Sequence, residues 1–171
     1  MIVIVGGVSG TGKSTVGQSL ARRLDWPFVD GDRLHSAANI AKMRSGVALT
    51  DDDRWPWLRA IGDRMDDYIR RGGSAVVASS ALKRSYRDLL TKGRPGVRIA
   101  FLESDQATLA ARLRARHGHF FRAALLGSQF ADLEPPQPDE GVLVVPATGA
   151  PDDIAADIAR RLHLSPSGQP A

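Results

Sequence analysis

The chain contains no cysteine among its 171 residues. This absence excludes disulfide bonds and metal sites built from thiolates. The sequence also has no apolar run long enough to cross a bilayer, and the apolar residues at its start are too few for a secretory signal. We therefore expect a cytoplasmic protein.

The positive charge of the chain is not concentrated in one place. The formal net charge is +4, but lysine and arginine are spread along the sequence, which argues against a nucleic-acid partner. A surplus of arginine also suits a site that binds phosphate groups. Length and composition fit one globular domain, which we assign to residues 1–164, and the Pro/Gly/Ser-rich residues 165–171 are expected to be a disordered tail.

A glycine-rich stretch near the start organises the chain. It fits the phosphate-binding pattern of glycine, four residues, glycine, lysine, and serine or threonine, and consists of Gly7, Val8, Ser9, Gly10, Thr11, Gly12, Lys13, Ser14 and Thr15. An apolar β-branched run precedes it and a helical apolar pattern follows it. In such a loop the backbone N–H groups bind phosphate, Lys13 reaches the outer phosphates and Ser14 holds magnesium. We predict a nucleoside triphosphate site.

Strand and helix patterns alternate along the whole chain. Strands are predicted at residues 1–5, 26–30, 74–79, 97–102 and 142–145. Helices are predicted after the glycine-rich loop, at 39–44 with Ser36 as a cap, in a longer segment with Pro56 in its first turn, at 83–92, at 105–116, and from about residue 151. This alternation predicts an α/β fold with a five-stranded parallel sheet covered on both faces. Ligands of such sheets bind beyond the carboxyl ends of the strands.

Several polar groups follow predicted strands. Asp30 and Asp32 end the second strand, two residues apart, so both carboxylates can face one crevice and support a magnesium ion or a proton transfer. The alternative is a polar turn in which Asp caps a helix. Ser79 ends the third strand and leads to the cationic helix start at Lys83, which indicates either an anionic ligand or a solvated basic surface.

Arginine occurs in two further candidate positions. Arg54 lies between three acids and two tryptophans, where its guanidinium can bind a carboxylate in two parallel bonds, although the acids also suit a helix start. Arg112 and Arg116 share one helix face and are either lid residues that close over phosphates or part of a solvated surface. His117 and His119 have no metal-ligand neighbours in the sequence, so we predict no zinc site.

Together these stretches closely resemble the gluconate kinases, which are small P-loop sugar-acid kinases related to shikimate kinase and the nucleoside monophosphate kinases. The resemblance extends from Met1 to about residue 162. It is carried by residues 7–15, 30–35, 39–43, 49–58, 80–88, 118–120 and 125–134. The phosphate loop alone indicates only a nucleotide-binding protein, whereas the combination with the other segments is far more specific.

The resemblance implies a P-loop kinase of the nucleoside monophosphate kinase and shikimate kinase type, with a lid, that uses ATP and Mg²⁺ and forms a homodimer. It implies transfer of the γ-phosphate of ATP to the 6-hydroxyl of D-gluconate. By the same resemblance, Asp32 contacts the sugar hydroxyl and serves as base, and Asp30 supports magnesium. The implied substrate-binding residues are Asp32, His35, Arg54, Lys83 and Arg87, and the implied ATP-binding arginines of the lid are Arg112 and Arg116.

The chain departs from the family pattern at three positions. Ser36 replaces the usual proline, Ser79 a frequent cysteine, and Pro146 an acid in the segment that cradles adenine, so the adenine pocket is not predicted. Two rival functions stay open: a kinase for another hydroxy acid such as shikimate, and a nucleotide-binding regulator without an acceptor. No Asn-Lys-x-Asp segment is present, which argues against a guanine-nucleotide switch.

Overall fold

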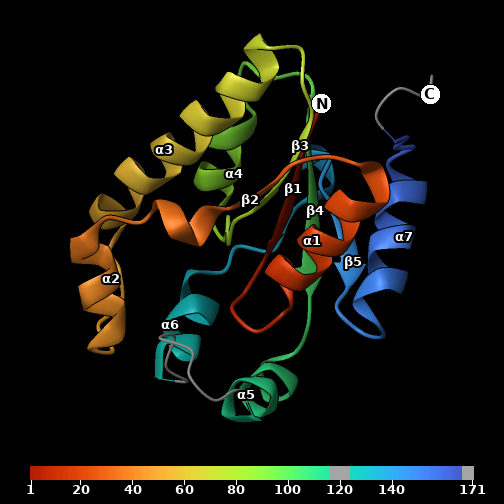
Figure 1. Ribbon diagram of the computed structural model, residues 1–171. Coiled ribbons are helices and arrows are strands. Elements are labelled where there is room, and N and C mark those ends of the chain that lie inside the picture. Colours follow the sequence, from red (N-terminus) through yellow and green to blue (C-terminus); the bar gives the residue numbers. More distant parts are fainter. Residues whose placement is uncertain (116–123, 167–171) are drawn as a thin grey trace.

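The computed structural model describes residues 1–115 and 124–166 of the chain. Its centre is a sheet of five parallel strands in the order β2-β3-β1-β4-β5 (Figure 1). The strands are β1 (Ile2–Gly7), β2 (Phe28–Asp30), β3 (Ala75–Ala78), β4 (Val97–Glu103) and β5 (Leu143–Pro146). The predicted α/β class and the parallel five-stranded sheet are confirmed.

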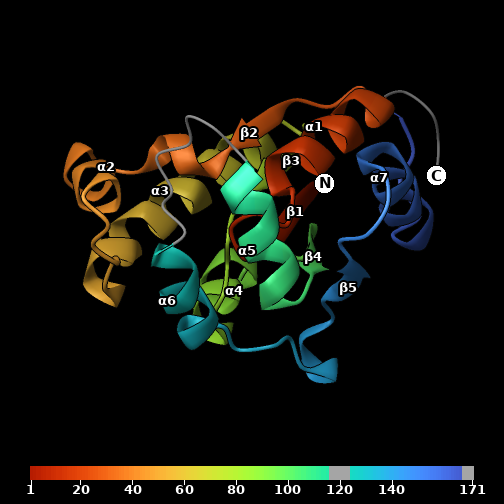
Figure 2. The same cartoon turned by 90° about the horizontal axis from the view of Figure 1, so that it is seen from below.

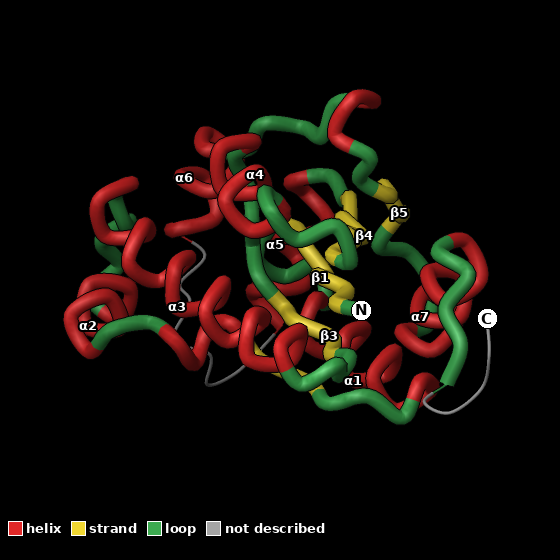
Figure 3. Tube along the Cα trace, turned by 90° about the horizontal axis from the view of Figure 1, so that it is seen from above, coloured by secondary structure: helices red, strands yellow, loops and turns green. Residues whose placement is uncertain are grey.

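Helices cover both faces of the sheet. They are α1 (Lys13–Leu24), α2 (Ala37–Arg44), α3 (Asp51–Arg70), α4 (Arg84–Thr91), α5 (Gln106–Ala115), α6 (Ala124–Asp132) and α7 (Pro151–Arg161), with two short 3₁₀ turns, η1 (Gly31–Leu34) and η2 (Pro138–Glu140). Figures 1 and 3 show α1 and α7 on one side of the sheet and α3 and α4 on the other. None of the helices in these described ranges is long and apolar enough to cross a membrane.

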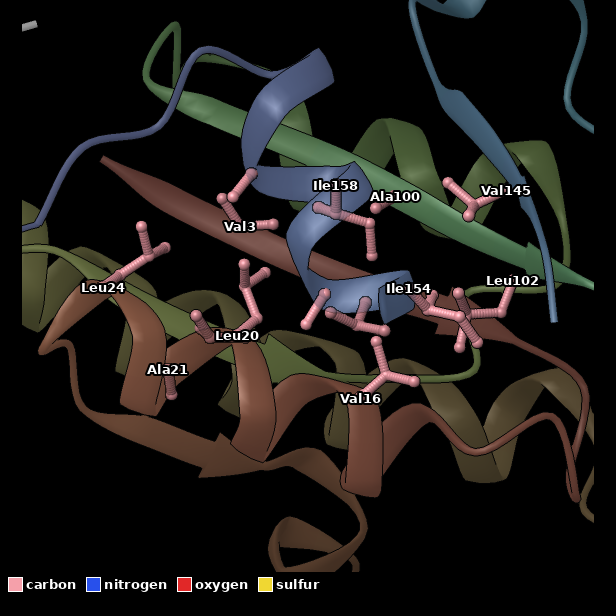
Figure 4. Close-up of a cluster of buried hydrophobic side chains, with 14 of the residues drawn as sticks. Val3, Val16, Leu20, Ala21, Leu24, Ala100, Leu102, Val145, Ile154 and Ile158 are labelled. Carbon is pink, nitrogen blue, oxygen red and sulfur yellow. The ribbon is translucent and has the colours of Figure 1, made fainter. Parts of the chain in front are cut away.

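The alternation of side chains along β1 explains why both faces are covered. Ile2 and Ile4 join one buried cluster with residues of α3 and α4, whereas Val3 and Val5 join another with α1 and α7. Figure 4 shows the second of these clusters between the sheet and the two helices. A strand that is apolar on both faces can be stable only between two layers of helices, as its continuous apolar run predicts.

Helix α3 begins earlier than predicted. Thr50 and Asp53 form a reciprocal capping box: the Asp53 N–H donates to Thr50 Oγ1 at 3.3 Å, and the Thr50 N–H donates to Asp53 Oδ2 at 2.9 Å. The first helical residue is therefore Asp51, and the prediction that Pro56 lies in the first turn is wrong. Pro56 lies in the second turn, where it removes one backbone hydrogen bond of the helix. The cap, which lies outside the apolar pattern, decided the boundary.

The remaining helix α6 was not predicted at all. It lies beyond the carboxyl ends of the strands together with α5, as the view from below shows (Figure 2). Leu125 and Leu126 are buried, and Leu126 packs with Leu109 of α5 and Val8 of the glycine-rich loop. This packing attaches α6 to the edge of the sheet where a ligand is expected to bind. Of the predicted tail, residues 167–171 lie outside the described residues.

Candidate active site

The glycine-rich loop joins β1 to α1 and requires glycine at two positions. Gly7 has a φ of +133°, and a Cβ atom there would lie 2.6 Å from the carbonyl oxygen of Leu102. Gly12 has a φ of 95° and is the N-cap of α1, where it places no side chain over the first N–H groups of the helix. The Gly7 N–H donates to Ser80 O at 3.2 Å, which ties the loop to the segment after β3. The loop therefore has the backbone shape and the helix terminus that phosphate binding needs.

Two side chains lie across this loop. The Lys13 ammonium donates to Val8 O at 3.2 Å, so it is held within the loop. Gln129 reaches the loop from α6, and its Oε1 accepts the Ser9 N–H at 2.7 Å. A loop N–H of this kind is where a phosphate oxygen is expected to bind. Helix α6 thus touches the expected phosphate site directly.

A pocket extends from the loop toward α3. It brings together five predicted site residues that are far apart in the sequence, which are Ser9, Lys13, Asp32, His35 and Arg54. Trp57, Leu82 and Leu125 contribute apolar wall to the same pocket. A pocket lined by both a phosphate loop and a guanidinium can hold a nucleotide phosphate and an anionic acceptor together.

The two carboxylates after β2 have different surroundings. Asp30 Oδ1 accepts the Asp32 N–H at 3.2 Å and so caps η1. Asp32 lines the pocket, whereas Asp30 is not among its lining residues. Gly31 between them is buried, and a Cβ there would collide with the carbonyl oxygen of Ala78, so glycine allows this turn to pack against β3. Asp32 is the carboxylate that can meet a substrate hydroxyl, and the magnesium role of Asp30 stays a prediction.

His35 is held as a neutral ring on the pocket wall. Its ring stacks on that of Trp57, with 4.2 Å between the ring centroids, and Nδ1 lies 3.4 Å from Asn39 Nδ2. Trp57 is fixed in turn because its Nε1 donates to Gly31 O at 2.7 Å. Burial lowers the pKa of His35 to about 4, although the nearby Asp32 carboxylate acts in the opposite direction. At neutral pH the imidazole can therefore form hydrogen bonds but carries no charge.

The low pKa of His35 predicts a loss of stability in mild acid. Between its ordinary pKa of 6.5 and the folded value of about 4, the unfolded chain binds a proton at His35 that the folded chain does not. The free energy of unfolding should therefore fall as the pH drops through this window, and His35 contributes no pH dependence above it. Urea unfolding at about pH 7.5 and about pH 5 should show a smaller drop for His35→Asn than for the unchanged protein. Equal drops would contradict this account.

Arg54 belongs to a charged network beside the pocket. It is only 8% exposed, and its guanidinium donates to the Tyr86 hydroxyl at 3.2 Å and pairs with Asp132 of α6 at 2.6 Å. Burial acts to lower the pKa of Arg54, but the hydrogen bonds that it donates to Tyr86 and Asp132 raise the pKa overall. The Tyr86 hydroxyl also donates to Asp51. The network keeps Arg54 charged and fixed in position at the pocket.

Lys83 lies at the edge of the same network rather than in the pocket lining. Its ammonium donates to both Asp51 oxygens, at 2.8 and 3.0 Å, and lies 3.6 Å from Asp132. Next to it, Arg84 pairs with Asp139 at 2.7 Å, and the Arg84 N–H donates to Glu134. The cationic start of α4 is therefore compensated by carboxylates of the chain itself.

Arg87 lies outside the pocket lining. It was expected to bind substrate, but it does not line the pocket and is only 2% exposed. Its Nε and one terminal nitrogen donate to Glu140 at 2.6 and 2.8 Å, and its other terminal nitrogen donates to the carbonyl oxygens of Ala81, Leu82 and Glu134. The ion pair with Glu140 is buried and holds the guanidinium within the fold, and the substrate-binding role of Arg87 stays a prediction.

Loss of the Arg87 side chain should destabilise the protein strongly. Arg87→Met leaves the Glu140 carboxylate, of which 3% of the side chain is exposed, without its partner. Breaking a buried ion pair in this way costs about 3–5 kcal/mol of unfolding free energy. Chemical denaturation measures this loss, and Arg84→Met is the matched control because its pair with Asp139 is exposed. Similar small changes in both variants would show that the Arg87 pair does not stabilise the fold.

The predicted lid arginines are only partly described. Arg112 of α5 donates to Ala147 O at 2.8 Å, directly after β5 and Pro146. It thus lies near the segment expected to hold adenine, but it does not line the pocket. Arg116, His117 and His119 lie outside the described residues. The nucleotide-binding role of Arg112 and Arg116 stays a prediction.

Sequence reasoning missed four residues of the site: Trp57, Tyr86, Gln129 and Asp132. Tyr86 and Trp57 each combine an apolar body with a polar atom that makes a hydrogen bond in the site. Gln129 and Asp132 are three residues apart, which is the spacing of one helix face, but residues 124–132 had not been predicted as a helix. Recognising α6 would have placed both side chains on one face.

Comparisons with known proteins agree with this site. Residues 2–136 match the model of an AAA domain family. A gluconokinase from Gluconobacter oxydans strain 621H is 44% identical over 161 residues, which cover 94% of this chain and 90% of that protein. A sugar kinase from Janibacter sp. HTCC2649 has a TM-score of 0.91 at 39% identity, covering 99% of this chain and 98% of that one.

A second solved structure, of a gluconokinase, is similar to this chain. The crystal structure of a gluconokinase from Sinorhizobium meliloti 1021 has a TM-score of 0.80 at 41% identity and covers 94% of both chains. Sequence identity and fold therefore agree over almost the whole length of the chain. The chain belongs to the gluconokinase family of P-loop kinases.

Proposed function

We propose that this protein is a gluconate kinase that transfers the γ-phosphate of ATP to the 6-hydroxyl of D-gluconate, giving 6-phospho-D-gluconate and ADP. The proposal rests on one observation, a single pocket that is lined by the phosphate loop, by Asp32 and by the buried cation Arg54. A sugar acid has a hydroxyl at one end and a carboxylate at the other. Such a molecule can direct its hydroxyl to the phosphate and its carboxylate to the arginine.

The residues of the chain then have distinct roles. Lys13 and the backbone N–H groups of the loop neutralise the phosphate charge that develops during transfer. Asp32 accepts the proton of the attacking hydroxyl and orients its oxygen. Arg54, fixed by Tyr86, binds the carboxylate and sets the position of the acceptor. His35 contributes a neutral hydrogen-bonding group on the wall.

A magnesium ion fits these residues as a partner of the nucleotide phosphates. The described residues contain no group of three or more His, Asp or Glu side chains that could hold a metal by themselves, which suits an ion held mainly by phosphates and water. Ser14, at the start of α1, and Asp30, at the end of β2, would hold it. When bound, the ion neutralises phosphate charge in the transition state.

Acceptor-dependent release of ADP tests the proposed function. Purified protein with ATP and magnesium is given D-gluconate, shikimate or no acceptor in parallel assays. Release that requires D-gluconate is the expected result. Release with shikimate alone would favour the rival hydroxy-acid kinase, and nucleotide binding without release in any arm would favour a regulator.

Four further features belong to the same proposal. Residues 1–164 form one kinase domain, which works in the cytoplasm as a homodimer. Arg112 and Arg116 bind ATP when the lid closes. Light scattering measures the dimer directly, and an Arg116→Ala variant should show a raised KM for ATP with an unchanged KM for D-gluconate.

A further inference from the structure

The cations expected to bind the substrate carboxylate already have carboxylate partners in the chain. Asp132 lies 2.6 Å from Arg54 and 3.6 Å from Lys83, and Asp51 lies 2.8 Å from Lys83. The two positive charges are thus matched by two negative charges. An incoming carboxylate must either add an uncompensated negative charge beside Arg54 or displace one of these partners. Asp132 is the partner that contacts Arg54 itself.

Asp132 is better placed to leave than Asp51. Asp51 lies in the first turn of α3, where the helix dipole stabilises it, and it is held by both Lys83 and Tyr86. Asp132 is the last residue of α6, its side chain is 27% exposed, and its two ion pairs are with Arg54 and Lys83. Arg54, by contrast, is buried and needs an anion beside it at all times. Exchange of one carboxylate for another satisfies both residues.

We propose that Asp132 is an internal competitor of the acceptor, a carboxylate that occupies Arg54 until a sugar acid replaces it. This inference rests on the proposed gluconate kinase function. A tethered carboxylate acts as a competitor at an effective concentration of about millimolar or more. Simple anions must overcome that competition with one ion pair alone. A sugar acid also gains contacts along its hydroxyl chain, so it alone displaces Asp132 readily.

Asp132→Asn tests this role because it keeps the shape of the side chain and removes its charge. The KM for D-gluconate should fall about three- to tenfold, and inhibition by acetate at constant ionic strength should become stronger by a similar factor. Asp139→Asn is the matched control, since it removes one surface carboxylate that pairs only with exposed Arg84. The control should change neither quantity.

The proposal requires that Asp132→Asn show both a lower KM for D-gluconate and stronger inhibition by acetate. A KM for D-gluconate that is unchanged or raised, or unaltered inhibition by acetate, would overturn the proposal, and a raised KM would mean that Asp132 holds Arg54 in place for the substrate. Asp132→Ser provides a second neutral variant if Asp132→Asn does not fold, as judged by thermal unfolding. Turnover of D-gluconate by the unchanged protein tests the proposed function. The role of Asp132 is tested separately, by the ratio of the KM values of the variant and the unchanged protein.

Discussion

Replacing Lys13 by alanine should lower kcat by about a hundredfold to a thousandfold, as removal of one preorganised donor to a transition state does. Lys13 lies in the pocket and is held within the glycine-rich loop through Val8 O. Its charge is therefore next to the phosphates, where the negative charge of the transition state develops. The side chain is only partly buried, so its loss leaves no large cavity and the fold should persist.

The control for this variant is Lys92→Ala. Lys92 follows α4, is exposed and lies outside the pocket lining. The Lys92→Ala substitution therefore removes one positive charge at a position away from the pocket. Steady-state assays with saturating D-gluconate and ATP give kcat, and circular dichroism checks the fold. A Lys13→Ala enzyme with near-normal kcat would show that the loop does not act on the transferred phosphate.

Asp32→Asn should lower kcat by about a hundredfold to ten-thousandfold while the KM for D-gluconate changes little. The amide keeps the size of the side chain and its ability to contact a hydroxyl, but it cannot accept the proton of the attacking oxygen. Asp32 is the carboxylate of the Asp30–Asp32 pair that lines the pocket. The loss should therefore appear in the chemical step.

Single-turnover measurements separate that step from substrate binding. Asp63→Asn is a suitable control because Asp63 is exposed on α3, away from the pocket lining. Near-normal single-turnover rates for Asp32→Asn would show that Asp32 is not the base. A raised KM with unchanged kcat would make it a binding residue only.

The parts of the fold that were predictable depend on short-range patterns. The apolar run of β1 and the spacing of Val16, Leu20 and Leu24 predicted a strand and a helix that the structure contains. The start of α3 was misplaced because a capping box at Thr50, outside the apolar pattern, sets it. Helix α6 was missed because its nine residues are stabilised by packing on Val8 and Leu109, which are distant in the sequence.

The sequence by itself predicted a nucleotide site, because the phosphate loop is one contiguous segment whose backbone shape follows from its own glycines. It also indicated the family, because several further segments along the chain match the family pattern. Only the tertiary structure showed which of two arginines lines the pocket. Arg54 and Arg87 were both predicted to bind substrate. Arg87 is buried against Glu140, which is 53 residues away in the sequence. Arg54 instead lines the pocket and pairs with Asp132. A guanidinium binds the carboxylate that the fold places beside it. The partners of Arg54 and Arg87 come from distant segments of the chain, so no local sequence pattern predicts these pairs.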